Sequence, residues 1–141
     1  MSFDVLGDVN YLAALVAAVA YFAFGALWYS PMVLAKPWMK AIGMDPERAG
    51  SQSPGPMLFI GTAIAYFVMA VVLAAIARSM PGATDVVDGL VLGILIGVGI
   101  GASQIWVNAA YEQRPAALFW INGANVILGY TLMAVIVTVW D

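Results

Sequence analysis

Several uncharged polar side chains lie inside stretches of the sequence that are otherwise apolar. Within a stretch, these residues lie three or four positions apart. Residues at such spacings fall on the same side of an α-helix, so each stretch carries its polar residues on one face. Carboxamides, hydroxyls and phenols donate and accept hydrogen bonds without carrying charge at neutral pH, so the chemistry they offer is recognition of a neutral polar group. The set consists of Tyr21, Thr62, Tyr66, Gln104, Asn108, Asn122 and Asn125.

The elements that must position these side chains are long uncharged runs. The chain has 141 residues, of which 64% are apolar and 9% are charged, whereas soluble domains are about half apolar and about a quarter charged. A helix needs about 20 apolar residues to cross the hydrocarbon core, which predicts spans at residues 9–30, 57–78, 89–110 and 116–139. The fold class expected is all-α: a polytopic integral membrane four-helix bundle, with residues 1–141 as a single transmembrane domain.

Charge placement predicts the orientation. Loops 31–56 and 111–115 hold Lys36, Lys40, Arg48 and Arg114, whereas the other side holds only Arg78. By the positive-inside bias, the two basic loops are expected to be cytoplasmic and both termini to lie outside. The first span is too long for a signal h-region and has no basic segment before it, so we expect it to remain in a multi-pass protein of a bacterial plasma membrane.

The first cytoplasmic loop, residues 31–56, is expected to contain a short interfacial helical segment. Its prolines exclude one continuous helix, but residues 37–42 can lie in the membrane interface and Gly43 can stop the turn. Asp45 followed by Pro46 is typical of a helix N-terminus. Aromatic and basic side chains that suit interfacial anchoring are Trp28, Tyr29, Lys36, Trp38 and Lys40.

The third span carries a glycine stripe, Gly89, Gly93, Gly97 and Gly101, in which each GxxxG step places two glycines on one face. Such a face lets another helix approach closely in lipid. One interpretation is packing within the chain, against the first or the second span. The other is a seam for a second copy or another membrane protein, which would make this chain a structural or accessory subunit.

The polar residues fall at a similar depth in the four spans, in the half next to the cytoplasmic loops. The outer halves of the spans are almost wholly apolar, which predicts a layer closed to polar molecules. Buried carboxamides need hydrogen-bond partners. They are either interhelical glue, at about 0.6 to 2 kcal/mol per contact, or the lining of a cytosol-facing site for a small molecule or lipid headgroup, in binding or transport. The proposed lining is Tyr21, Tyr66, Gln104, Asn108, Asn122 and Asn125. A small oligomeric channel is a third hypothesis, which the sealed outer half disfavours.

Several function classes have no residues to carry them. The chain has no cysteine and no histidine, which removes thiol chemistry, imidazole catalysis and zinc sites from consideration. The spans hold no ionisable group of the kind that proton-coupled transport usually uses. We therefore expect no enzyme activity, no metal and no cofactor. The expected partners are membrane lipids and, where the chain assembles, a second copy or a membrane protein, but no nucleic acid.

The segment Gly25–Pro31, with Lys36 to Lys40 after it, resembles the signature of a membrane protein family known as DUF1761. The similarity extends over nearly the whole chain. It includes the opening Asn10–Ala13, a glycine-rich third span ending near Asn108, a loop with Glu112, Arg114 and Pro115, and a last span that opens with Phe119, Ile121 and Asn122. The resemblance implies a small four-span membrane protein and brings no activity, substrate or catalytic residue with it.

Overall fold

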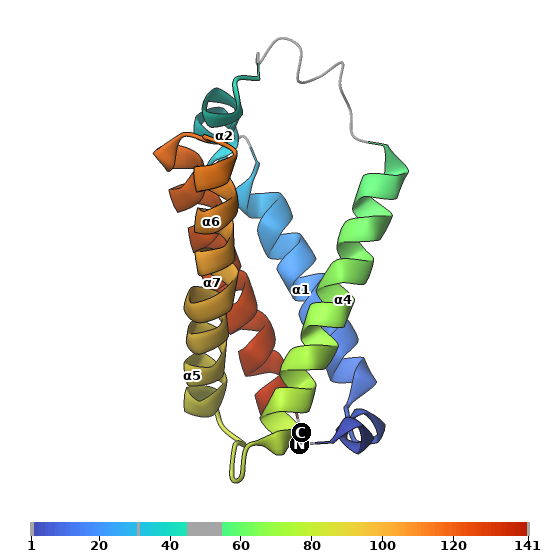
Figure 1. Ribbon diagram of the computed structural model, residues 1–141. Helices are drawn as coiled ribbons and strands as arrows, with labels where there is room; N and C mark the ends of the chain where they lie inside the picture. The colour runs from blue at the N-terminus through green and yellow to red at the C-terminus, as the bar shows by residue number, and fades with distance from the viewer. Residues whose placement is uncertain (1, 31, 45–54, 141) are drawn as a thin grey trace.

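The computed structural model describes residues 2–30, 32–44 and 55–140, and helices make up most of this part of the chain (Figure 1). Four of its helical spans are long and apolar enough to cross a membrane, which confirms the predicted helical bundle. The elements are η1 (Phe3–Gly7), α1 (Tyr11–Trp28), α2 (Ala35–Ile42), α4 (Pro56–Ser79), α5 (Val86–Ile96), the π-helical turn η2 (Gly97–Ala102), α6 (Ser103–Tyr111) and α7 (Ala116–Val139).

Local sequence signals explain where the helices begin and end. The third span begins at Val86 rather than at Gly89, because Asp85 and Asp88 form a capping box that satisfies the first backbone N–H groups. The predicted short helix of the first loop is α2, which begins at Ala35 and stops before Gly43, whose φ of 73° is the left-handed conformation that glycine adopts readily. The predicted N-cap at Asp45 and Pro46 lies outside the described residues.

The two ends of the bundle differ. The start of α1, the end of α7 and the turn between α4 and α5 lie at one end, here called the terminal end (Figure 1). There the Asn10 side-chain amide donates to the Trp140 carbonyl over 3.4 Å. Helix α2, the start of α4 and the turn between α6 and α7 lie at the other end, here called the α2 end.

The core is densest toward the terminal end and is built from small side chains. Ala14 and Ala17 of α1 and Ala70 of α4 are completely buried. Alanine lets two helices approach closely, and close packing is what stabilises helix pairs in lipid. Met133, Ala134 and Val137 of α7 complete the same cluster, so the sealed half that the sequence indicates is a closely packed one.

Helix α4 loses these contacts toward the α2 end. The buried residues of α4 begin at Ala70, whereas Met57, Leu58, Phe59, Ile60 and Ile64 are exposed. In Figure 1 the start of α4 stands apart from α6 and α7, and the helices converge toward the terminal end. The bundle is therefore closed at the terminal end and open between α4 and its neighbours at the α2 end.

The glycine stripe packs against α7. A Cβ atom at Gly89 would lie 2.6 Å from the Cα of Val135, one at Gly93 would collide with the Cα of Thr131, and one at Gly97 would lie 2.9 Å from the Cα of Ile127. The interpretation of intramolecular packing therefore fits, but the predicted partners, the first or second span, are wrong. Because α7 covers this face, the stripe does not offer a free surface to another subunit.

The stripe ends where the third span changes its winding. Residues Gly97–Ala102 form a π-helical turn, which inserts extra chain into an otherwise α-helical span. The Ser103 hydroxyl donates to the Val98 carbonyl, five residues back, over 2.9 Å. Within this turn, a Cβ atom at Gly101 would meet the side chains of Val126 and Tyr130 instead of α7 backbone.

Candidate functional site

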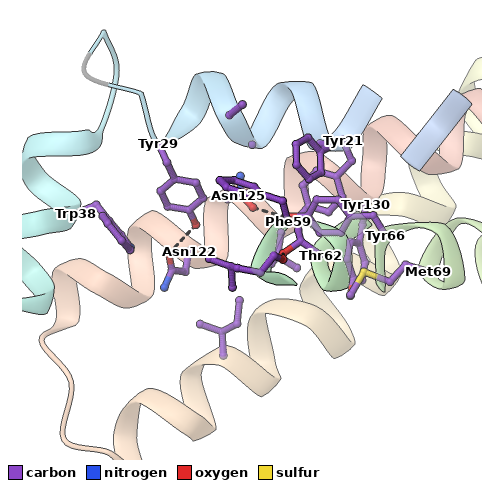
Figure 2. A pocket seen from close by; sticks show the side chains of 16 residues that line it. Tyr21, Tyr29, Trp38, Phe59, Thr62, Tyr66, Met69, Asn122, Asn125 and Tyr130 are labelled. Carbon is purple, nitrogen blue, oxygen red and sulfur yellow. Dashed lines mark hydrogen bonds between the residues drawn. The ribbon is translucent and has the colours of Figure 1, made fainter. Parts of the chain in front are cut away.

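A cavity of about 660 Å³ occupies the opening between α4 and the rest of the bundle. Its walls come from α1, α4 and α7, with Trp38 of α2 and Ile105 of α6 at its margins (Figure 2). The divergence of α4 opens this space: Tyr66 still reaches Tyr21 of α1, whereas Phe59, nearer the start of α4, lines the opening. A volume of this size is typical of small-molecule sites.

Tyr21 and Asn125 form the deepest polar contact of the cavity. The Tyr21 hydroxyl donates to the Asn125 Oδ1 atom over 2.9 Å, and the two residues are only 2% and 3% exposed. The Asn125 Nδ2 atom, in contrast, has no hydrogen-bond partner among the described residues. A buried carboxamide on the cavity wall thus retains an unused donor.

Gly129 makes this contact geometrically feasible. It lies one helical turn beyond Asn125 on α7, and a Cβ atom at this position would collide with the Tyr21 ring. The ring lies flat against the helix only because no side chain stands there. Asn122, Asn125 and Gly129 lie on one face of α7, as their spacing in the sequence indicates. Tyr21 of α1 packs against this face.

A second polar contact lies nearer to the α2 end. The Tyr29 hydroxyl donates to the Asn122 Oδ1 atom over 2.7 Å, and the Trp28 indole donates to the Ile121 carbonyl over 3.1 Å. Figure 2 shows Tyr29 pointing from the end of α1 toward Asn122 of α7. Tyr29 and Trp28, which the sequence indicates as interfacial anchors, thus fasten α1 to α7 as well.

Aromatic rings line the remaining wall. The Tyr66 ring of α4 stacks on Tyr21 with centroids 4.1 Å apart, and Tyr130 of α7 meets Tyr21 edge-on at 6.4 Å. The Tyr29 and Trp38 rings meet at 5.7 Å, which brings α2 to the rim. Such ring pairs add specific packing to the burial of apolar area. The result is a rigid, flat-sided cavity with polar atoms at only a few points.

The structure brings together four of the six residues of the predicted lining. Tyr21, Tyr66, Asn122 and Asn125 all line the cavity, as does Thr62, whose hydroxyl donates back to the Leu58 carbonyl. Gln104 and Asn108 do not line it. Both are exposed on α6, where the Gln104 Nε2 atom donates to the Asn108 Oδ1 atom over 3.0 Å, and Asn108 lines a smaller hollow beside the cavity.

Tyr29, Trp38 and Tyr130 also line the cavity, although the sequence predicts Tyr29 and Trp38 only as interfacial anchors and does not single out Tyr130. A signal for Tyr130 existed: it lies eight residues after Asn122, which is the same helical face. No comparable signal existed for Trp38, since its approach to the cavity depends on how the chain folds back after α1.

The cavity carries no formal charge, because none of the described residues that line it is Asp, Glu, Lys or Arg. The nearest ion pair, Arg114 with Glu112 at 3.2 Å, lies in the turn between α6 and α7 and is about half exposed. It borders a smaller hollow of about 200 Å³, which shares Asn122 and Ile105 with the cavity. Among the described residues, no cluster of three or more acidic side chains could hold a metal ion.

Comparisons with known proteins give one match. The model of a family described as protein of unknown function (DUF1761) matches residues 12–138, and this range contains every residue of the cavity wall. No curated protein and no solved structure matches the chain.

Proposed function

The chain belongs to the DUF1761 family, and we propose that its cavity binds an uncharged small molecule or the neutral headgroup of a lipid. In the described part of the chain, four helices are long and apolar enough to cross a membrane. The protein is an integral membrane protein. Its role in this proposal is binding or transport without catalysis, at a site formed by Tyr21, Tyr66, Asn122 and Asn125.

The observation that carries the proposal is the unpartnered donor of Asn125. Asn125 lines the cavity, and its Nδ2 atom is buried and has no hydrogen-bond partner among the described residues. Leaving a buried polar group unsatisfied costs about 1 to 3 kcal/mol. A ligand with a carbonyl, hydroxyl or ether oxygen at this point would accept the bond and remove the cost.

The wall chemistry supports a neutral ligand. A charged ligand taken out of water needs a counter-charge, and the described lining offers none. Tyrosine and tryptophan rings provide flat apolar contact with a polar atom at the edge. These features favour a partly apolar molecule that makes one or two hydrogen bonds.

Interhelical glue is the competing explanation for the same contacts. The bonds from Tyr21 to Asn125 and from Tyr29 to Asn122 both join α1 to α7, and such bonds contribute on average about 0.6 kcal/mol in membrane proteins. Glue accounts for the two carboxamide oxygens. It does not account for the free donor of Asn125.

Native mass spectrometry of the protein released from lipid nanodiscs tests the proposal. We expect the wild-type protein to retain a defined extra mass and the Asn125→Leu variant to lose it. Gln104→Leu is the matched control, because it also replaces a carboxamide with leucine, at a position in a membrane helix that does not line the cavity. The double variant Tyr21→Phe with Asn125→Leu removes both partners of the buried bond and should fold normally. Retention of the mass by folded Asn125 variants would leave the carboxamide as packing glue.

The cavity opens toward the α2 end. This end carries Lys36 and Lys40 on α2 and Arg114 in the turn between α6 and α7. By the positive-inside bias we place this end, and with it the site, at the cytoplasmic face of a bacterial plasma membrane. A ligand would then reach the cavity from the cytosol or from the inner leaflet.

A further inference from the structure

A second hollow adjoins the cavity. It is a groove of about 470 Å³ between α1 and α4, and every residue that lines it is apolar. Phe22 of α1 and Phe59 of α4 line both the cavity and the groove, and their ring centroids are 6.3 Å apart. These two rings therefore lie between the cavity, which has a few polar atoms on its wall, and a wholly apolar groove.

The groove follows the helices toward the terminal end. Its lining reaches from Phe22 back to Leu15 on α1 and from Phe59 on to Phe67 on α4, a distance of about 10 to 12 Å at 1.5 Å per residue. Val19 and Ala63, which line it, are exposed on the outside of the bundle. In a bilayer the groove is open to hydrocarbon chains along its length.

We propose that the ligand of the cavity is a neutral amphiphile with one apolar chain. Its polar end accepts the hydrogen bond from Asn125, and its chain crosses over the touching rings of Phe22 and Phe59 to lie in the groove between α1 and α4. This inference rests on the proposed function and narrows it to one ligand class.

The two compartments together select this class over other membrane molecules. A phospholipid would bring a phosphate into the cavity, where none of the described lining residues is Lys or Arg. A small polar molecule without a chain would occupy the cavity and leave the groove empty. The groove adjoins the cavity at Phe22 and Phe59, so a ligand with a chain can occupy both. One groove beside one cavity accommodates one chain.

Monoacylglycerols provide probes with a constant neutral head and a variable chain. We would measure retention of monolaurin and of monobutyrin by native mass spectrometry of the protein in nanodiscs. Monolaurin should bind about tenfold more tightly than monobutyrin, a difference equal to about 1.4 kcal/mol. The Asn125→Leu variant should lose both, because both depend on the same donor.

A substitution that fills the groove tests the path of the chain. Ala63→Phe places a ring in the groove from an exposed position and should weaken monolaurin binding about tenfold, or by about 1.4 kcal/mol, while monobutyrin binding stays unchanged. Ala65→Phe is the matched control, because Ala65 is also exposed on α4 but lines neither the groove nor the cavity.

The outcomes separate the two proposals. Equal retention of both probes that is lost in Asn125→Leu, with no effect of Ala63→Phe, would overturn the amphiphile and leave a site for small neutral molecules. Retention of monolaurin that ignores Asn125→Leu would overturn both, since the lipid would then adhere only to the surface of the bundle.

Discussion

At the scale of single residues, the site depends on a glycine as much as on its polar groups. Tyr21 can donate to Asn125 only while its ring lies against Gly129. The sequence indicates the polar partners, because carboxamides inside apolar spans are rare and need partners. The sequence does not reveal that Gly129 contacts an aromatic ring, because a glycine in a membrane helix can face a backbone, a ring or lipid and nothing in the sequence distinguishes these cases.

A Gly129→Ala variant should therefore be less stable. The added methyl collides with the Tyr21 ring, and overpacking of this kind costs about 1 to 3 kcal/mol. Thermal unfolding in detergent, followed by loss of the monodisperse peak in gel filtration, measures the change. Gly61→Ala on α4 is the control, because a Cβ atom there meets nothing within 4 Å; equal stability of the two variants would contradict the close contact.

At the scale of helices, hydropathy was enough to predict the spans but not their neighbours. Four long uncharged runs dictate four membrane helices, and the structure contains them. The stripe from Gly89 to Gly97 shows that a helix must pack there, yet any of three helices could supply the opposing surface. Likewise, the spacing of Gln104 and Asn108 places them on one face without saying where that face points, and the π-helical turn before them alters its direction.

The seam between α5 and α7 predicts a large effect of filling it. In Gly93→Ala the new methyl meets the Thr131 backbone, which cannot rotate away as a side chain can, so we expect a loss near the upper end of the overpacking range, about 3 kcal/mol. The same unfolding measurement applies. Gly99→Ala, whose Cβ atom meets nothing within 4 Å, should be nearly neutral. Unaltered stability with a smaller assembly size would instead indicate that the stripe joins two chains.

At the scale of the whole molecule, the bundle has one closed end and one open end, and the open end is also the basic one. The closed end joins Asn10 to Trp140 over a core of alanines, while the α2 end carries the cavity together with Lys36 and Lys40. The sequence alone suggested this polarity, because polar depth and loop charge vary together along it. The divergence of α4 that opens the cavity could not be predicted, because the angle between membrane helices depends on their packing and not on hydropathy or loop charge.

Single cysteines test the orientation of the molecule, and the chain has none of its own to interfere. Tyr111→Cys lies beside the turn between α6 and α7, and Thr84→Cys lies in the turn between α4 and α5. A membrane-impermeant maleimide should label Thr84→Cys in intact cells and Tyr111→Cys only after lysis. The reverse pattern would place the cavity on the outer face of the membrane.

The π-helical turn decides which face of the third span borders the cavity. It holds one residue more than α-helical winding would, so each residue after it stands about 100° away from the position that an unbroken α-helix would give it. In an unbroken helix Gln104 would take the place that Ile105 holds at the cavity margin. One extra residue thus keeps a carboxamide out of the cavity wall and an apolar side chain in it.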